Sequence, residues 1–300
     1  METETYWQVQ TTDYHNDTTP LQHIIHDSRN IQSLTNNIIW NIFADQEHNI
    51  WLGTDYGISL SRYNSALQFI PISQITGTGD GNQFYSLFRD SKGFYWFGGA
   101  NGLIRFTDPA GERHDAIWYR MGDKTYPLSH NRIRHIYEDK EQQLWIATDG
   151  SINRYDYATR QFIHYNIVDN TGTYNTNWTY YIFEDTAGQL WISTCLGGIF
   201  VVDKHKLMQS TSGQYIAEQN YSVHNGLSGM FINQIIPDNE GNVWVLLYNN
   251  KGIDKINPRT REVTKLFADE LTGEKSPNYL LCDEDGLLWV GFHGGVMRIN

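Results

Sequence analysis

The sequence predicts an all-β fold of the β-propeller class, and three observations lead to this prediction. A short unit in which Asp precedes Trp by six positions occurs six times along the 300 residues. The polar residues between this Asp and Trp are typical of tight turns, and the flanking segments have the short apolar runs of strands. No segment shows a convincing helical period over ten residues.

The six copies are regularly spaced, with successive Trp residues separated by 45, 49, 46, 53 and 45 positions. This spacing fits one four-stranded propeller blade per copy. Six recognisable blades would form either a closed six-bladed ring or part of a seven-bladed propeller. The pairs are Asp45/Trp51, Asp90/Trp96, Asp139/Trp145, Asp185/Trp191, Asp238/Trp244 and Asp283/Trp289.

Each copy reads as strand, tight turn, strand, loop, strand, turn and strand. The first strand leads into the Asp, whose carboxylate can cap backbone N–H groups, and a Gly three positions later accepts the positive φ of such a turn. His48 and Gln142 stand where the other four copies have Gly. The second strand carries the Trp in an apolar run, as expected for a strand covered on both faces. We therefore interpret the repeated Asp and Trp as structural.

The chain is expected to form a single domain over residues 1–300. Residues 37–300 hold blades one to six, and residues 1–36 hold strand-like pieces at 6–10 and 21–26. These pieces either complete the sixth blade, which would close a ring, or belong to a preceding blade of a longer array. An unpaired strand edge is a liability for a stable chain, which slightly favours closure.

Composition limits the classes of function. The chain has 22 Lys and Arg against 34 Asp and Glu, a formal net charge of −12, which argues against nucleic-acid binding and against contact with an anionic membrane. Cys195 and Cys282 lack the spacing of a zinc site and are expected to be buried thiols. No apolar run approaches a membrane span, and residues 1–12 do not resemble a signal peptide. No catalytic motif is present, so we expect no metal, no cofactor and no enzymatic activity.

Candidate binding residues lie where the loops of several blades converge. In a propeller the loops between second and third strands share a face with the loops between blades, and ligands usually bind there. Aromatic, amide, carboxylate and Arg groups on this face would suit a sugar ring and its hydroxyls. The alternative is that the aromatic residues merely fill gaps between blades. The candidates are Trp40, Tyr56, Tyr85, Asn101, Arg134, Asp149, Trp178, Tyr180, Tyr248, Asn249 and His293.

The copies also resemble a known repeat family. FADQEHNIWLGTDYGISLSRYN at 43–64 and FRDSKGFYWFGGANGLIRFTD at 88–108 follow the pattern Asp-x-x-Gly-x-Leu-Trp-Ile-Gly-Thr and then Gly-Leu-x-Arg-Tyr. In this pattern the chain resembles two-component regulator propeller repeats over about residues 20–300. The resemblance implies a periplasmic sensor region of an inner-membrane hybrid two-component system, with any kinase outside this chain.

The resemblance implies that the partner is an oligosaccharide or another small ligand, or a neighbouring propeller or second protomer. Two alternatives stay open. The fifth copy, with GIDKINPRTREVTKL at 252–266, is similar to streptogramin lyase blades, and His293 could then act as a general base. The chain could also be a scaffold that binds other proteins.

Overall fold

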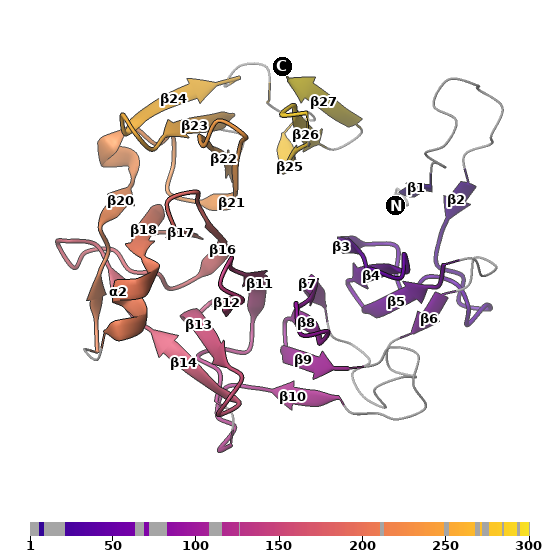
Figure 1. Ribbon diagram of the computed structural model, residues 1–300. Helices are drawn as coiled ribbons and strands as arrows, with labels where there is room; N and C mark the ends of the chain where they lie inside the picture. The colour runs from indigo at the N-terminus through magenta and orange to yellow at the C-terminus, as the bar shows by residue number, and fades with distance from the viewer. Residues whose placement is uncertain are drawn as a thin grey trace. The chain divides into compact units, whose positions relative to one another are not determined.

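Nearly all the regular structure of the chain is β-strand (Figure 1). The computed structural model describes residues 6–8, 22–63, 69–71, 83–107, 116–125, 127–210, 213–248, 252–267, 271, 276–283, 285–292 and 295–299. Within these ranges the only helical elements are α2 (Lys204–Gln209) and the short 3-10 helix η2 (Val223–Asn225). None of the helices in these ranges is long and apolar enough to cross a membrane. The all-β prediction is confirmed.

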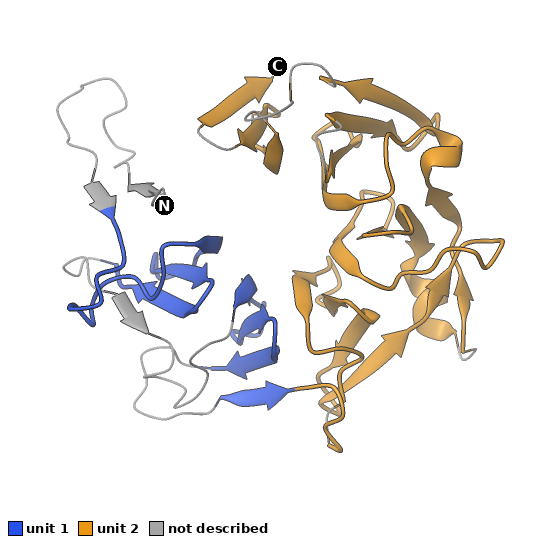
Figure 2. Cartoon of the chain, turned by 180° about the vertical axis from the view of Figure 1, so that it is seen from behind, with its two compact units in different colours: residues 1–119 blue, residues 120–300 orange. Residues whose placement is uncertain are grey.

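The chain divides into two compact units, residues 1–119 and 120–300 (Figure 2). The first unit contains two four-stranded antiparallel sheets and a two-stranded pair. The first blade is β3 (Ile39–Ala44), β4 (Ile50–Thr54), β5 (Gly57–Ser61) and β6 (Phe69–Pro71). The second is β7 (Phe84–Arg89), β8 (Tyr95–Gly99), β9 (Gly102–Phe106) and β10 (Ile117–Tyr119). The strand-like pieces near the N-terminus, β1 (Tyr6–Gln8) and β2 (Gln22–Ile24), pair with each other.

The second unit contains four blades. The third is β11 (Ile133–Glu138), β12 (Leu144–Thr148), β13 (Ser151–Asp156) and β14 (Gln161–Tyr165). The fourth is β16 (Thr179–Glu184), β17 (Gln189–Thr194), β18 (Ile199–Asp203) and β20 (Gln219–Tyr221). The fifth is β21 (Ile232–Pro237), β22 (Val243–Leu247), β23 (Ile253–Asn257) and β24 (Glu262–Leu266). The sixth is β25 (Pro277–Cys282), β26 (Leu288–Phe292) and β27 (Gly295–Ile299). A parallel pair, β15 (Ile167–Val168) and β19 (Tyr215–Ile216), lies beside the fourth blade.

Each sheet has its strands in chain order, and the first strands of successive blades contact one another within each unit. Consecutive antiparallel strands packed side by side through their innermost members are the arrangement of a propeller. The predicted fold class, a β-propeller with six recognisable blades, is confirmed. Five blades have four strands, and the sixth has three in the ranges described.

The repeated Asp and Trp are bonded to each other in all six blades. The indole Nε1–H donates to the Asp carboxylate over distances from 2.6 Å for Trp289 and Asp283 to 3.1 Å for Trp244 and Asp238. In each blade the other carboxylate oxygen also accepts backbone N–H bonds in the turn. The Asp thus fixes both the turn and the orientation of the core Trp.

The repeated Trp residues of the first three blades are completely enclosed. Trp51, Trp96 and Trp145 each have 0% of their surface exposed. The Trp51 ring packs against Tyr95 of the second blade with centroids 5.2 Å apart, and the Trp96 ring stacks on Tyr119 at 6.0 Å. Because apolar rings of this size bury a large area, each indole contributes strongly to the core of its blade.

The turn that follows each Asp needs a residue with positive φ. Four blades place Gly there, for example Gly93 with φ 87°. His48 and Gln142 adopt the same conformation, with φ of 63° and 60°. Because this conformation is unfavourable for residues with a Cβ, these two turns are strained relative to the others.

One blade junction in the second unit holds a buried charge cluster. Lys204, the first residue of α2, has a fully buried side chain, and its Nζ lies 2.8 Å from Glu184 Oε1 and 3.2 Å from Asp139 Oδ2. Glu184 belongs to the fourth blade and Asp139 to the turn of the third. The ammonium group therefore bridges the two carboxylates and joins the two blades.

Candidate functional site

The residues named from the repeat do not belong to any exposed site. Trp51, Trp96 and Trp145 are fully buried and bond their own Asp, so a ligand on the surface of the protein cannot contact them. These Trp residues lie in the cores of their blades. The functional site has to be built from the other candidates.

A β-bulge recurs at one position of every innermost strand. In each blade the register with the second strand shifts across the residue five positions before the repeated Asp. A bulged residue is left out of the ladder, and its side chain is re-aimed relative to a regular strand. Four of the six bulged residues are binding candidates from the sequence. The six are Trp40, Tyr85, Arg134, Tyr180, Asn233 and Asn278.

In the first unit, the structure brings Trp40 and Tyr85 together. Their rings form an edge-to-face contact with centroids 5.6 Å apart. Trp40 Nε1 donates to Asp55 Oδ1 at 3.1 Å, and Gln83 Nε2 donates to the same oxygen at 2.6 Å. Tyr85 in turn donates to the Gln83 side chain. Asp55 and Gln83 were not among the residues selected from the sequence.

In the second unit, Arg134, Asp149 and Tyr180 form a matching cluster. Arg134 Nε and Nη2 donate to the two carboxylate oxygens of Asp149 at 2.8 and 3.3 Å, a bidentate ion pair. The guanidinium lies over the Tyr180 ring, with Cζ 4.4 Å from the centroid. Burial raises the pKa of the Tyr180 hydroxyl, and the positive charge of Arg134 opposes this rise.

The two clusters occupy equivalent repeat positions. Asp55 and Asp149 each follow the core Trp of their blade by four residues, and Trp40 and Arg134 are both bulged. In each case a bulged donor bonds this Asp and contacts the bulged Tyr of the next blade. Arg134 therefore has a positional counterpart in Trp40.

A pocket of about 210 Å³, which we call the inner pocket, lies beside Tyr180. Its walls come from the innermost strands of blades four and five and from the turns after their second strands: Tyr180, Cys195, Phe231, Ile232, Asn233 and Tyr248. Tyr248 is 61% exposed, and the Asn233 side chain makes no hydrogen bond within the ranges described. Burial raises the pKa of the Cys195 thiol, which disfavours a reactive thiolate.

The remaining binding candidates from the sequence belong to neither of the two clusters nor to the described lining of the inner pocket. Tyr56 and Asn101 are exposed in the turns that precede β5 and β9 of the first unit. Trp178 is 49% exposed, and its backbone N–H donates to Asp149 O at 2.9 Å. Asn249 and His293 lie outside the described residues.

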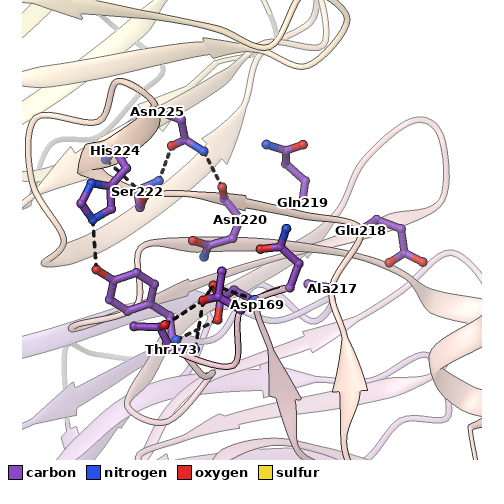
Figure 3. Close-up of a pocket in the computed structure, with 12 residues that line it drawn as sticks. Asp169, Thr173, Ala217, Glu218, Gln219, Asn220, Ser222, His224 and Asn225 are labelled. Atoms are coloured by element: carbon purple, nitrogen blue, oxygen red, sulfur yellow. Dashed lines mark hydrogen bonds between the residues drawn. The ribbon is translucent and has the colours of Figure 1, made fainter.

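A second, larger cavity involves residues that the sequence analysis did not select. This outer hollow has a volume of about 460 Å³ and lies at the outermost strand of the fourth blade. Figure 3 shows Ser222, His224 and Asn225 on one side and Asp169 with Thr173 on the other. Its lining is Asp169, Asn170, Thr171, Thr173, Tyr174, Ala217, Glu218, Gln219, Asn220, Ser222, His224 and Asn225.

Both walls of the outer hollow are held by local hydrogen bonds. Asp169 accepts from the Tyr174 backbone N–H at 2.8 Å and from the Thr171 hydroxyl, which closes the loop after β15. On the opposite wall, Ser222 and Asn225 form a capping box at η2. The hollow is therefore pre-organised, and the described residues of its lining include no Lys or Arg.

A third depression, the middle hollow, borders the outer hollow. It has a volume of about 210 Å³ and shares Thr173 and Tyr174 with the outer hollow. Its remaining lining residues are Asn175, Asn177, Trp178, Leu196 and Gly197. Trp178 lines the middle hollow and Cys195 lines the inner pocket. The backbone N–H of Cys195 donates to the carbonyl oxygen of Trp178 at 3.0 Å, so residues of the two linings are bonded to each other.

The described residues hold no group of three or more His, Cys, Asp or Glu placed to bind a metal ion. The inner pocket and the middle hollow are lined mainly by aromatic, amide and apolar side chains, whereas the outer hollow adds hydroxyl groups, a histidine and two carboxylates. Such groups can bind a neutral polar molecule by stacking and hydrogen bonding.

Comparison with known proteins shows that the chain is similar to the extracellular domain of a bacterial two component system. Two crystal structures of the extracellular domain of one putative system from B. thetaiotaomicron, described as a one component and as a hybrid two component system, are each 99% identical to the chain, with a TM-score of 0.75. The match covers 96% of this chain and 38% of those chains. The chain therefore spans well under half the length of these relatives.

More distant similarities concern the fold alone. A second putative hybrid two component system of B. thetaiotaomicron matches in its extracellular domain at 20% identity and a TM-score of 0.69, covering 90% of this chain and 33% of that one. Virginiamycin B lyase from Staphylococcus aureus matches at 15% identity and 0.62, covering 87% and 80%. No curated protein sequence matches the chain.

The family match falls on the repeats themselves. Residues 33–56, 78–101 and 127–150 match the two component regulator propeller family. These segments cover the inner strand, turn and second strand of the first three blades, where the Asp–Trp bond and the bulge lie. The chain thus contains repeats of the two component regulator propeller family.

Proposed function

We propose that this chain is a ligand-sensing propeller in the extracellular, periplasmic part of a hybrid two-component receptor, and that it binds an oligosaccharide. The observation that carries the proposal is the inner pocket, with the Arg134–Asp149–Tyr180 cluster beside it. Its aromatic rings can stack on a sugar, and its amide and hydroxyl groups can bond sugar hydroxyls. The 99% identity to an extracellular domain supports the receptor assignment.

Signal output would lie outside this chain. Interlocked antiparallel blades are stiff, so a bound ligand would act by favouring one packing arrangement between this propeller and a neighbouring propeller or second protomer. The chain covers 38% of the 99% identical receptor domains, which leaves room for such neighbours.

Isothermal titration calorimetry with neutral plant and host oligosaccharides tests the proposal. At least one sugar should bind, and Tyr248→Ala should weaken its binding about fivefold, since one stacking contact of about 1 kcal/mol is lost. Tyr63→Ala is the matched control, because Tyr63 is 59% exposed and lies in the other unit. If no saccharide binds the purified protein, the proposal fails.

The enzymatic alternative is not favoured. The similarity to virginiamycin B lyase is at 15% identity and shows the fold alone, and His293, the residue suggested as base, is outside the described residues. The 99% identical relatives are described as extracellular domains of signalling systems.

A further inference from the structure

The three depressions of the second unit follow one another across the fourth blade. The outer hollow lies at β20, the outermost strand of this blade, and the inner pocket lies at β16, its innermost strand. The middle hollow shares two residues with the first and is bonded to the second through Trp178 and Cys195. Together they form a continuous line of lining residues on the side of the interblade loops.

Each depression contains at least one aromatic side chain that a sugar ring could stack on. The outer hollow has Tyr174, the middle hollow has Trp178, and the inner pocket has Tyr180 and Tyr248. Trp178 is half-exposed, and its indole N–H makes no hydrogen bond within the described part of the chain. Its amphipathic ring is therefore available for both stacking and hydrogen bonding.

Unused polar groups also occur along the line. In the outer hollow, the side chains of Asn170 and Gln219 make no hydrogen bond in the described ranges, and His224 has only a 3.5 Å contact with Tyr174. Asp169 and Glu218 are already engaged, the first within its loop and the second with the Tyr215 hydroxyl at 2.8 Å. The groups left for a ligand are thus neutral donors and acceptors.

The charge of the linings indicates the class of ligand. Among the described residues, no Lys or Arg lines any of the three depressions, and the carboxylates of this lining, Asp169 and Glu218, belong to the outer hollow. An acidic or sulfated glycan would meet repulsion there and no counter-charge, because Arg134 beside the inner pocket is already paired with Asp149.

We propose that the three depressions bind one extended, neutral oligosaccharide that runs along the fourth blade from the inner pocket through the middle hollow to the outer hollow. This inference rests on the proposed function and specifies its ligand. Affinity would then grow with chain length, because each further sugar reaches a new aromatic residue.

A length series tests this inference. Calorimetry would compare the disaccharide to hexasaccharide members of the best-binding neutral series, for example arabino-, galacto- or manno-oligosaccharides. We expect affinity to rise at least tenfold from the disaccharide to the longest members. Size-matched oligogalacturonides and sulfated heparin fragments should bind at least tenfold more weakly.

Single variants show which residues cause the increase in affinity with oligosaccharide length. Trp178→Ala and His224→Ala should each remove most of the increase in affinity with length, whereas His205→Ala should retain it. His205 is the matched control because it is an exposed histidine of the same unit that lines none of the depressions. Thermal melting of each variant would verify folding.

The outcomes separate the two proposals. Binding that does not strengthen beyond the disaccharide, or a length gain that survives both variants, overturns the extended site but leaves sugar sensing in place. Tighter binding of acidic fragments overturns the neutral specificity. An absence of binding to every saccharide overturns both.

Discussion

The guanidinium of Arg134 lies 4.4 Å from the centre of the Tyr180 ring and joins the third blade to the fourth beside the inner pocket. Two hydrogen bonds to Asp149 fix the orientation of the same guanidinium. Arg134 thereby positions Tyr180, which lines the pocket. The arrangement depends on the planar, forked shape of the Arg side chain as much as on its charge.

Arg134→Lys should therefore lower ligand affinity about five- to tenfold, because the stacking on Tyr180 and the bidentate bond are lost while the charge remains. Calorimetry with the best-binding oligosaccharide measures the effect. Arg132→Lys is the control, since Arg132 is more exposed and lies 3.6 Å from Asp149. An unchanged affinity in Arg134→Lys would show that the positive charge alone matters.

Lys204→Met should destabilise the fold by about 3–5 kcal/mol, because it leaves the buried carboxylates of Asp139 and Glu184 without a counter-charge. Urea unfolding followed by tryptophan fluorescence measures this. Lys206→Met, in the same helix but with an exposed side chain, should change stability by less than about 0.5 kcal/mol. A small effect at Lys204 would mean that the cluster relaxes or takes up protons.

Gln142→Gly should stabilise the protein by about 0.5–1 kcal/mol. Relief of the left-handed conformation outweighs the added freedom of Gly in the unfolded chain. The reciprocal change, Gly93→Gln, should destabilise by about 1 kcal/mol, and no neighbouring atom would clash with its Cβ. Chemical denaturation of both variants checks the pair. Effects of the same sign would contradict the backbone explanation.

His135 makes stability depend on pH. Its ring stacks on Tyr181 with centroids 3.7 Å apart, and burial lowers its pKa to about 3. Because the unfolded chain binds the proton first as pH falls below about 6.5, protonation favours unfolding, and stability is lost between pH 6.5 and 3.

The variant His135→Phe keeps an aromatic ring but cannot titrate. Since His135 retains some exposed surface, we expect the wild type to lose about 1–2 kcal/mol more than this variant between pH 6.5 and 5. Denaturant midpoints at the two pH values give the comparison. Parallel pH profiles would show that His135 is not the titrating group.

The blades could be predicted from sequence because their determinants are local and repeated. The turn after each Asp and the apolar run around each Trp can be recognised within a segment of about twelve residues, and both elements occur in the structure. The indole–carboxylate bond and the bulges cannot be predicted from such a short segment, because both depend on the register between neighbouring strands. The partnership of Trp40 with Asp55 follows from that register.

The outer hollow escaped prediction because non-repeated segments form it. Its walls are the loop after β15 and the segment from Ala217 to Asn225 beyond α2. The sequence did carry one signal: the spacing of 53 from Trp191 to Trp244 is the longest in the chain and marks extra structure within the fourth blade.

The recurring bulge has a consequence for how such receptors diversify. The residue at this position is skipped by the strand pairing in every blade, so its identity does not set the register, and Trp, Tyr, Arg and Asn all occur there. Duplicated receptors could therefore acquire new ligand preferences by substitution at these few positions without redesigning the core. The repeated Asp and Trp residues would stay the same while the bulged residues change.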